Sequence, residues 1–290
     1  MIPKRIVNEP ARTIRQSARE AMKGRMSLLV LSAILYMLCI SLPVVIVEQI
    51  TGLWQTIDSI MDEMMAAYEE MFTNPASTAL FDLAQRNSGT LTPSLASFIF
   101  LLLVPGPLTL GLSTIWLRVL RRDEAYADMV FSGFGNFARV VVMDTLRRIV
   151  MALFAILFII PGVFMYYRYN LVFFLLADNP DMKPLEALGL SRFYMQQNKG
   201  NRFVLDLTFI GWFAVSCIAY YFIVNGVSYL IQYGENNVSI FVAMLVSVVL
   251  SSVIFAPLLA YRGVAAAEYY HRVICRDPQE KRPLPAPRLD

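Results

Sequence analysis

The fold is decided by an uncharged apolar run near the start of the chain, MSLLVLSAILYMLCISLPVVIV, which occupies Met26–Val47. An α-helix needs about 20 mostly apolar residues to cross a hydrocarbon core of about 30 Å. This run is long enough, and it lacks the charged edge of a surface helix in a soluble protein. It follows a basic segment, and no small-residue cleavage site follows it. We therefore expect a retained membrane anchor rather than a signal peptide.

The same pattern recurs along the chain, because four further stretches contain no Asp, Glu, Lys or Arg: Asn87–Leu117, Ile149–Tyr167, Leu207–Gly234 and Asn236–Tyr261. Hydrophobic residues make up 57% of the chain and charged residues 16%, against about 45–50% and about 25% in soluble proteins. The sequence predicts an all-α, polytopic transmembrane helix bundle with about six membrane segments. We place them at 27–47, 94–117, 149–160, 163–177, 203–224 and 238–261.

The remaining segments complete a single membrane domain over residues 27–276. Residues 1–26 are basic and carry apolar side chains in three- and four-residue steps, which predicts a cytoplasmic amphipathic helix with an apolar stripe of Val7, Ala11, Ile14, Ala18 and Ala21. Residues 48–93 form an acidic outer loop. Residues 277–290 contain four prolines and no apolar periodicity, which favours a disordered cytoplasmic tail.

Charges between the apolar runs predict the orientation. The segment before Met26 has seven basic and two acidic residues, whereas residues 48–93 have seven acidic residues and only Arg86 as a base. Arg118–Arg148 and the region from Arg262 onward are rich in basic residues. Because cytoplasmic flanks retain an excess of Lys and Arg, we expect a plasma-membrane protein with both termini cytoplasmic and the acidic loop outside.

The segment Ile149–Ala177 has basic flanks on both sides, so it must enter the membrane and return. Two full crossings need about 40 helical residues, and this segment is shorter. Pro161-Gly162 lies near its middle, where a missing N–H and a flexible glycine favour a reversal. We expect a hairpin of two short helices. The alternative is one long kinked helix, which would place the tail outside.

Two parts of the chain resemble each other. The segment from Lys23-Gly24 and the segment from Lys199-Gly200 each follow an amphipathic helix and lead into a span. Each is later followed by a span containing Pro-Leu, at Pro107 and at Pro257. The sequence thus predicts a possible parallel internal repeat, an arrangement that occurs in transporters; chance similarity between apolar segments is the alternative.

Several motifs lie in the second half of the chain, among them Ile159-Ile160-Pro161-Gly162, Ala177-Asp178-Asn179-Pro180, Leu205–Trp212 and Ala267-Glu268-Tyr269-Tyr270. Together they resemble an uncharacterised bacterial integral-membrane family, catalogued as domain of unknown function 975. The resemblance implies a multi-span helical membrane protein and supplies no reaction. More remotely, the chain is similar to the membrane domains fused to bacterial glycerophosphodiester phosphodiesterases, which implies a link to lipid.

The sequence offers little for catalysis or metal binding. His271 is the sole histidine and follows the last span, so we expect it at a solvated or interfacial position. One imidazole cannot build the multi-histidine sites of zinc enzymes. Phosphate-binding loops, dinucleotide fingerprints and nucleophile elbows do not occur. We therefore expect a protein that is not an enzyme, with no catalytic residue, cofactor or metal.

Two charged residues are expected within the membrane. Ionised groups in hydrocarbon are costly unless they are paired or hydrated, so they mark candidate functional sites. We predict an ion pair between Arg168 and Asp206, with Tyr166, Tyr167 or Tyr169 donating a hydrogen bond nearby. This pair would hold a proton or an anionic substrate, or it would be a structural tie.

Prolines inside the apolar runs predict helix breaks. Pro105-Gly106-Pro107 and Pro257 should bend or interrupt their spans, and Pro161-Gly162 should form the hairpin. Transporters use broken helices to build substrate sites, although kinks also occur without that role.

The outer loop contains an apolar face with several methionines at helical spacing: Trp54, Ile57, Met61, Met64, Tyr68 and Met71. Residues 54–72 therefore offer a surface for a protein partner or a homo-oligomer. Copper(I) binding through the thioethers is the alternative.

These observations favour a non-enzymatic multi-pass membrane protein with a structural or regulatory role in the cell envelope. The alternative is a transporter or lipid-handling permease. Membrane lipids are the expected partners, and the net charge of +3 does not indicate nucleic-acid binding. A polar cavity reaching the middle of the membrane would favour transport, whereas a dry interior would favour the structural role.

Overall fold

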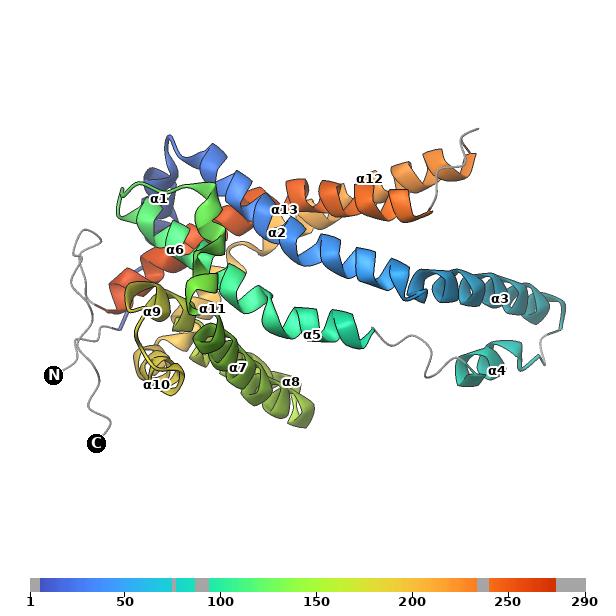
Figure 1. Ribbon diagram of the computed structural model, residues 1–290, viewed down its shortest axis with the longest axis horizontal. Helices are drawn as coiled ribbons and strands as arrows, with labels where there is room; N and C mark the ends of the chain where they lie inside the picture. Colours follow the sequence, from blue (N-terminus) through green and yellow to red (C-terminus); the bar gives the residue numbers. More distant parts are fainter. Residues whose placement is uncertain (1–5, 75–76, 87–93, 234–239, 275–290) are drawn as a thin grey trace.

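The computed structural model describes residues 6–74, 77–86, 94–233 and 240–274. Every regular element in these ranges is a helix (Figure 1). The elements are α1 (Ala11–Met22), α2 (Met26–Ile50), α3 (Leu53–Thr73), α4 (Ala79–Arg86), α5 (Leu95–Leu103), α6 (Pro105–Leu120), the 3-10 helix η1 (Ala127–Asn136), α7 (Phe137–Leu157), α8 (Ile159–Arg168), α9 (Val172–Asp178), α10 (Pro184–Met195), α11 (Lys199–Leu207), α12 (Ile210–Tyr233) and α13 (Ile240–Val273). The predicted all-α bundle is confirmed.

The helices gather at one end of the molecule and spread toward the other (Figure 1). The short helices α1, α9, α10 and α11, with η1, surround the adjoining ends of α6 and α13; we call this part the cap. From the cap, α2 and α3 lead away in one line, α12 and α13 lie side by side, and α7 and α8 form a separate hairpin.

The chain is a membrane protein, because several of its helices are long and apolar enough to cross a bilayer. Within the described ranges four segments qualify: Met26–Ile50, Leu95–Leu120, Ile159–Asp178 and Val242–Val273. The bent pair Lys199–Leu207 and Ile210–Gly226 makes a fifth if it is one span broken by 42°. About six segments were expected. The difference is that two short segments were expected over 149–177, whereas only Ile159–Asp178 qualifies there. Helix α7 does not qualify, because Asp144, Arg147 and Arg148 precede its apolar end.

The core packs most tightly where α6 crosses α13. A Cβ atom added at Gly263 would lie 2.0 Å from Cε2 of Trp116, so only glycine lets the indole lie flat on α13. Trp116 also lies near Phe174, with 6.2 Å between the ring centroids and 39° between the ring planes. Contrary to the prediction, Pro257 does not break α13, which continues through it to Val273. A single proline removes one N–H bond, and neighbouring helices allow such a helix to continue.

The second span is interrupted at Val104, between α5 and α6. Pro105, Gly106 and Pro107 are the first three residues of α6, where N–H groups have no partner within the helix. The two prolines therefore start a new helix at little cost. Pro105 has no N–H to bond the carbonyl of Leu101 four residues earlier, so that carbonyl needs another donor.

The α7–α8 hairpin reverses three residues earlier than predicted. The break falls at Phe158, which is extended with φ −159° and ψ 147°, and Pro161 lies in the first turn of α8. Gly162 does not form the turn but permits close packing: an added Cβ would lie 2.8 Å from Cβ of Ala155. The tip is strongly apolar and exposed, as the exposed fractions of Phe158, Ile159 and Ile160 are 73%, 81% and 82%.

The cap ties the start of the chain to the end of α13. The apolar side chains Val7, Ile14, Ala18 and Met22 are buried, so the amphipathic helix α1 turns its apolar face onto the bundle. Predicted stripe residues Ala11 and Ala21 are partly buried against the same core. Polar contacts reinforce this: Val7 N donates to Asn198 Oδ1 at 3.0 Å, Arg19 Nε donates to Tyr261 Oη at 2.8 Å, and Arg272 pairs with Glu9.

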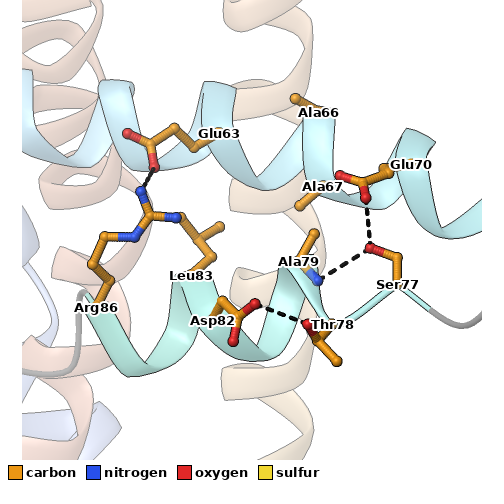
Figure 2. Close-up of a pocket in the computed structure, with 10 residues that line it drawn as sticks. All are labelled: Glu63, Ala66, Ala67, Glu70, Ser77, Thr78, Ala79, Asp82, Leu83 and Arg86. Atoms are coloured by element: carbon orange, nitrogen blue, oxygen red, sulfur yellow. Dashed lines mark hydrogen bonds and ion pairs between the residues drawn. The ribbon is translucent and has the colours of Figure 1, made fainter.

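At the far end from the cap, α3 and α4 form an antiparallel pair (Figure 1). Figure 2 shows an open polar cleft between them, crossed by an ion pair of Glu63 and Arg86 at 3.8 Å and by a bond from Ser77 Oγ to Glu70 Oε1 at 2.9 Å. Glu48, at the end of α2, is buried and accepts bonds from Ser94 N and Oγ at 3.2 and 3.3 Å. This joins α2 to the start of α5.

The order of elements is similar in the two proposed repeat units: α1 leads into α2, and α10 leads into α11 and α12. Both first spans lead away from the cap and both Pro-containing spans return to it (Figure 1). Duplication itself stays a prediction. Parts of the outer loop (75–76 and 87–93), residues 238–239 of the last segment and the tail 277–290 lie outside the described residues.

We expect Gly162→Ala to destabilise the protein by about 1–3 kcal/mol, because overpacking a close contact forces the arms of the hairpin apart. Thermal unfolding in detergent should show a lower midpoint. Gly211→Ala is the matched control, since nothing lies within 4 Å of an added Cβ there. Equal midpoints for both variants would contradict the observed packing of the hairpin.

Candidate functional site

A cavity of about 310 Å³ with polar and apolar walls lies between α2, α6, α7, α8, α9, α11 and α13. Its walls include aromatic and small residues such as Trp116, Phe173 and Gly263. Its polar lining is dominated by guanidinium and hydroxyl groups: Tyr36, Thr109, Ser113, Arg147, Arg148, Tyr166, Asn170, Arg202 and Arg262. We call it the arginine cavity.

The arginine cavity reaches the middle of two spans. Tyr36 lies ten residues after the start of α2 and fourteen before its end, and Thr109 lies fourteen residues after Leu95 and eleven before Leu120. The hydroxyl groups of Tyr36 and Thr109 are hydrogen-bonded at 3.2 Å, which joins the two spans across the cavity. Polar groups at this depth are far from the water at either surface.

The first charged cluster of the cavity is centred on Asp144. This carboxylate is fully buried and binds Arg147 Nη2 at 2.6 Å and Arg148 Nη2 at 2.7 Å. Arg148 Nη1 also donates to the carbonyl of Leu101 at 2.8 Å. That is the carbonyl which Pro105 leaves without its helical donor, so the arginine replaces a backbone hydrogen bond lost at the break.

The predicted break residue Gly106 lies against the same cluster. A Cβ added there would approach Asp144 Cβ to 3.1 Å and Oδ2 to 3.2 Å. The interrupted span therefore packs its glycine directly on the buried carboxylate.

The second charged cluster is centred on Asp206. Its Oδ1 lies 3.0 Å from Arg262 Nε and 3.4 Å from Arg202 Nη2. Arg262 Nη2 also donates to Tyr166 Oη at 3.1 Å, and Arg202 Nε donates to Asn170 Oδ1 at 2.9 Å. The cluster connects α8, α11 and α13 around one side of the cavity.

The two clusters together carry an excess of positive charge. Four arginines face two carboxylates, which gives 4 − 2 = +2 when all six groups are ionised. Arg202 is only 2% exposed, and its Nη1 atom has no hydrogen-bond partner within the described residues. Guanidinium groups bind carboxylate and phosphate oxygens in pairs. The arginine cavity is therefore suited to an anionic group.

The predicted pairing of Asp206 with Arg168 is wrong, because Asp206 pairs with Arg262 and Arg202 instead. Tyr166 and Arg168 are two residues apart, so they point to nearly opposite faces of α8. Tyr166 faces α13, whereas Arg168 lies near its neighbours: Nη1 is 3.8 Å from Met165 Sδ, and Cζ is 5.9 Å from the ring centroid of Tyr169. Tyr166 is at the cavity, and Tyr169 is not among its lining residues.

Five charged residues of the site were missed by sequence reasoning: Asp144, Arg147, Arg148, Arg202 and Arg262. Their basic members lie next to apolar runs, where arginines are normally taken as charges at the membrane surface. The spacing of Asp144 three and four residues before two arginines was the available signal, since it places all three on one helix face.

Two other features singled out from the sequence, His271 and the apolar face of α3, do not line the arginine cavity. His271 was expected at a solvated or interfacial position, and its side chain is buried, with an exposed fraction of 1%. Met61, Met64 and Tyr68 are exposed on α3, with fractions of 48%, 39% and 48%. The side chains of Trp54 and Ile57 lie outside the described residues. A partner or second copy bound through residues 54–72 stays a prediction.

A double-mutant cycle distinguishes the observed ion pair from the predicted one. Asp206→Asn and Arg262→Gln should show a coupling free energy of about 0.5–1.5 kcal/mol, at the lower end of values for contacting residues, because the Arg262 side chain is 40% exposed. Asp206→Asn and Arg168→Gln should be additive within about 0.5 kcal/mol. Chemical unfolding of the three single variants, the two double variants and the parent protein measures both values. Stronger coupling to Arg168 would refute this assignment.

Comparison with known proteins agrees with the resemblance seen in the sequence. Residues 156–277 match a family described as protein of unknown function, DUF975. The matched region contains Tyr166, Arg202, Asp206 and Arg262, whereas the Asp144 cluster precedes it. None of the curated proteins and none of the solved structures matches the chain, so the remote similarity to glycerophosphodiester phosphodiesterases gains no support. The segment that builds α8 to α13, with the second charged cluster of the cavity, is therefore similar to the DUF975 family.

Proposed function

We propose that this membrane protein is a permease which accepts an anionic group in the arginine cavity and moves it through part of the bilayer. One observation carries the proposal: a polar cavity with an excess of guanidinium groups reaches the middle of two membrane spans. The arginines would bind the anion, and the hydroxyl groups of Tyr36, Thr109 and Tyr166 would complete its hydrogen bonds.

The cost of such a cavity supports a functional role. Charged side chains inside a membrane are expensive, and those that occur commonly mark substrate pathways. A protein that needed only a stable bundle would gain more from apolar packing than from four buried or half-buried guanidinium groups. Nη1 of Arg202 is the sharpest example, because it has no protein acceptor and an anion in the cavity would supply one.

The positions of the helix breaks also support transport. Pro105, at the first break, lines the cavity, and Arg202 and Asp206 precede the 42° break between α11 and α12. Discontinuous helices are a frequent way to build a substrate site in transporters, and they can change angle with limited repacking.

A structural or regulatory role in the cell envelope is the second candidate. It is favoured by the exposed apolar side chains of α3, among them Met61, Met65 and Phe72, because a partner could cover them. The two candidates are compatible, since α3 lies far from the cavity along the molecule (Figure 1).

We also propose a cellular location for the protein and a role without catalysis. We propose that the protein lies in the plasma membrane with its cap at the cytoplasmic face, because basic residues of α1 such as Arg12, Arg15 and Arg19 lie there. The termini would then be cytoplasmic and α3–α4 outside. We propose a non-enzymatic role because the cavity offers arginines and hydroxyl groups but no activated nucleophile or general base.

Inorganic phosphate and sulfate should stabilise the purified protein more than chloride at equal ionic strength. A ligand that binds only the folded state at a hundred times its Kd adds about 2.7 kcal/mol, so the unfolding midpoint should rise and then saturate. Arg202→Gln should abolish most of the rise. Arg118→Gln is the matched control, because Arg118 is exposed and lies outside the cavity. If phosphate acted no differently from chloride, or equally on both variants, the proposed function would fail.

A further inference from the structure

An apolar groove of about 380 Å³ adjoins the arginine cavity. Its walls come from α11, α12 and α13, with single residues from α2 and α8. Aromatic and aliphatic side chains such as Phe203, Phe213 and Leu258 make up most of the lining. Leu259 and Arg262 line both the groove and the arginine cavity, so the two spaces meet at the guanidinium group of Arg262.

The groove opens sideways from the bundle. Leu207, Ile210 and Phe213 line it and have exposed fractions of 44%, 63% and 53%. These residues belong to the bent span of α11 and α12, so the surroundings of the opening are lipid rather than water. An occupant of the groove would therefore come from the bilayer and be apolar.

The charge at the join selects the kind of lipid. Each carboxylate is shared by two arginines: Asp206 pairs with Arg202 and Arg262, and Asp144 pairs with Arg147 and Arg148. The cavity therefore keeps an excess of two positive charges. A free anion would use the cavity and leave the groove without an occupant. A zwitterionic headgroup would bring a cation toward four arginines, which is unfavourable.

We infer that the ligand is an anionic phospholipid, with its phosphate in the arginine cavity and one acyl chain in the apolar groove. This inference rests on the proposed function and specifies its substrate class. Arg262 stands at the boundary, where its guanidinium group binds phosphate and its methylene groups contact the first part of the chain. A lipid could enter through the open side of the groove without crossing the polar cap.

Photo-crosslinking in nanodiscs tests this assignment. The protein is placed in phosphatidylcholine discs that contain a small fraction of either phosphatidic acid or phosphatidylcholine with a diazirine on one acyl chain. Peptide mass spectrometry then maps the crosslinks. We expect crosslinks at Phe203, Leu207 and Phe213 to be about tenfold more abundant with the phosphatidic acid probe, the ratio that corresponds to a modest preference of about 1.4 kcal/mol.

Variants separate the two parts of the site. Arg262→Gln should remove the preference for phosphatidic acid. Ile210→Trp should fill the groove and lower the crosslinking there, while leaving stabilisation by inorganic phosphate unchanged. Val215→Trp is the matched control, because Val215 is 60% exposed on the same helix and does not line the groove. Excess inorganic phosphate should also compete with the phosphatidic acid probe.

Two results would overturn the inference. Equal crosslinking by both probes, or crosslinks spread evenly over the exposed faces of α12 and α13, would show that the groove has no preference for an anionic lipid. If phosphate still stabilised the protein through Arg202, the arginine cavity would bind a free anion and the proposed function would stand. Loss of the phosphate effect as well would remove both.

Discussion

The structure depends on one hydrogen bond from a side chain that replaces a missing backbone hydrogen bond. Pro105 interrupts the second span and leaves the carbonyl of Leu101 without its helical donor, and Arg148 supplies a donor at 2.8 Å. The same guanidinium group is held by Asp144, which also binds Arg147. A backbone carbonyl without a hydrogen-bond donor is costly inside a membrane. Arg148 stabilises the break by donating to this carbonyl, and Asp144 holds the guanidinium groups of Arg148 and Arg147 in place. The break in the span is therefore stabilised by arginines that lie inside the bundle.

The Asp144 and Asp206 clusters face each other across one cavity, and their opposite walls come from different parts of the chain. Asp144, Arg147 and Arg148 belong to the arm of α7, whereas Arg202 and Arg262 come from α11 and α13. Because the two clusters lie on separate helices, a change in the angle of α11 against α12 or of α5 against α6 would alter the distance between them. An anion bound by both would favour one arrangement over the other, which is the thermodynamic requirement for ligand-driven motion.

Apolar runs predicted the helical class and the membrane character well, because these depend on composition and on local periodicity. The resemblance to the family came from motifs such as Ile159-Ile160-Pro161-Gly162 and agrees with the match over residues 156–277. The site was predicted only in part. Asp206 and Tyr166 are in it, but the partner of Asp206 is Arg262 rather than Arg168, and the reversal of the hairpin is at Phe158 rather than at Pro161-Gly162. Both differences arise from packing between helices: the direction of a side chain on α8 and the contact of Gly162 with Ala155 cannot be derived from sequence spacing alone.

The central claim is that this bundle encloses a hydrated, cationic cavity within the membrane. Reaction of a single cysteine with a small water-soluble methanethiosulfonate tests it most directly, in a background where Cys39, Cys217 and Cys275 are alanine. Ser113→Cys places the thiol in the cavity, and Val249→Cys places it on the exposed face of α13. We expect the cysteine at 113 to react faster in proteoliposomes and phosphate to slow its reaction. Reaction no faster than at position 249 would mean that the bundle holds no hydrated, cationic cavity.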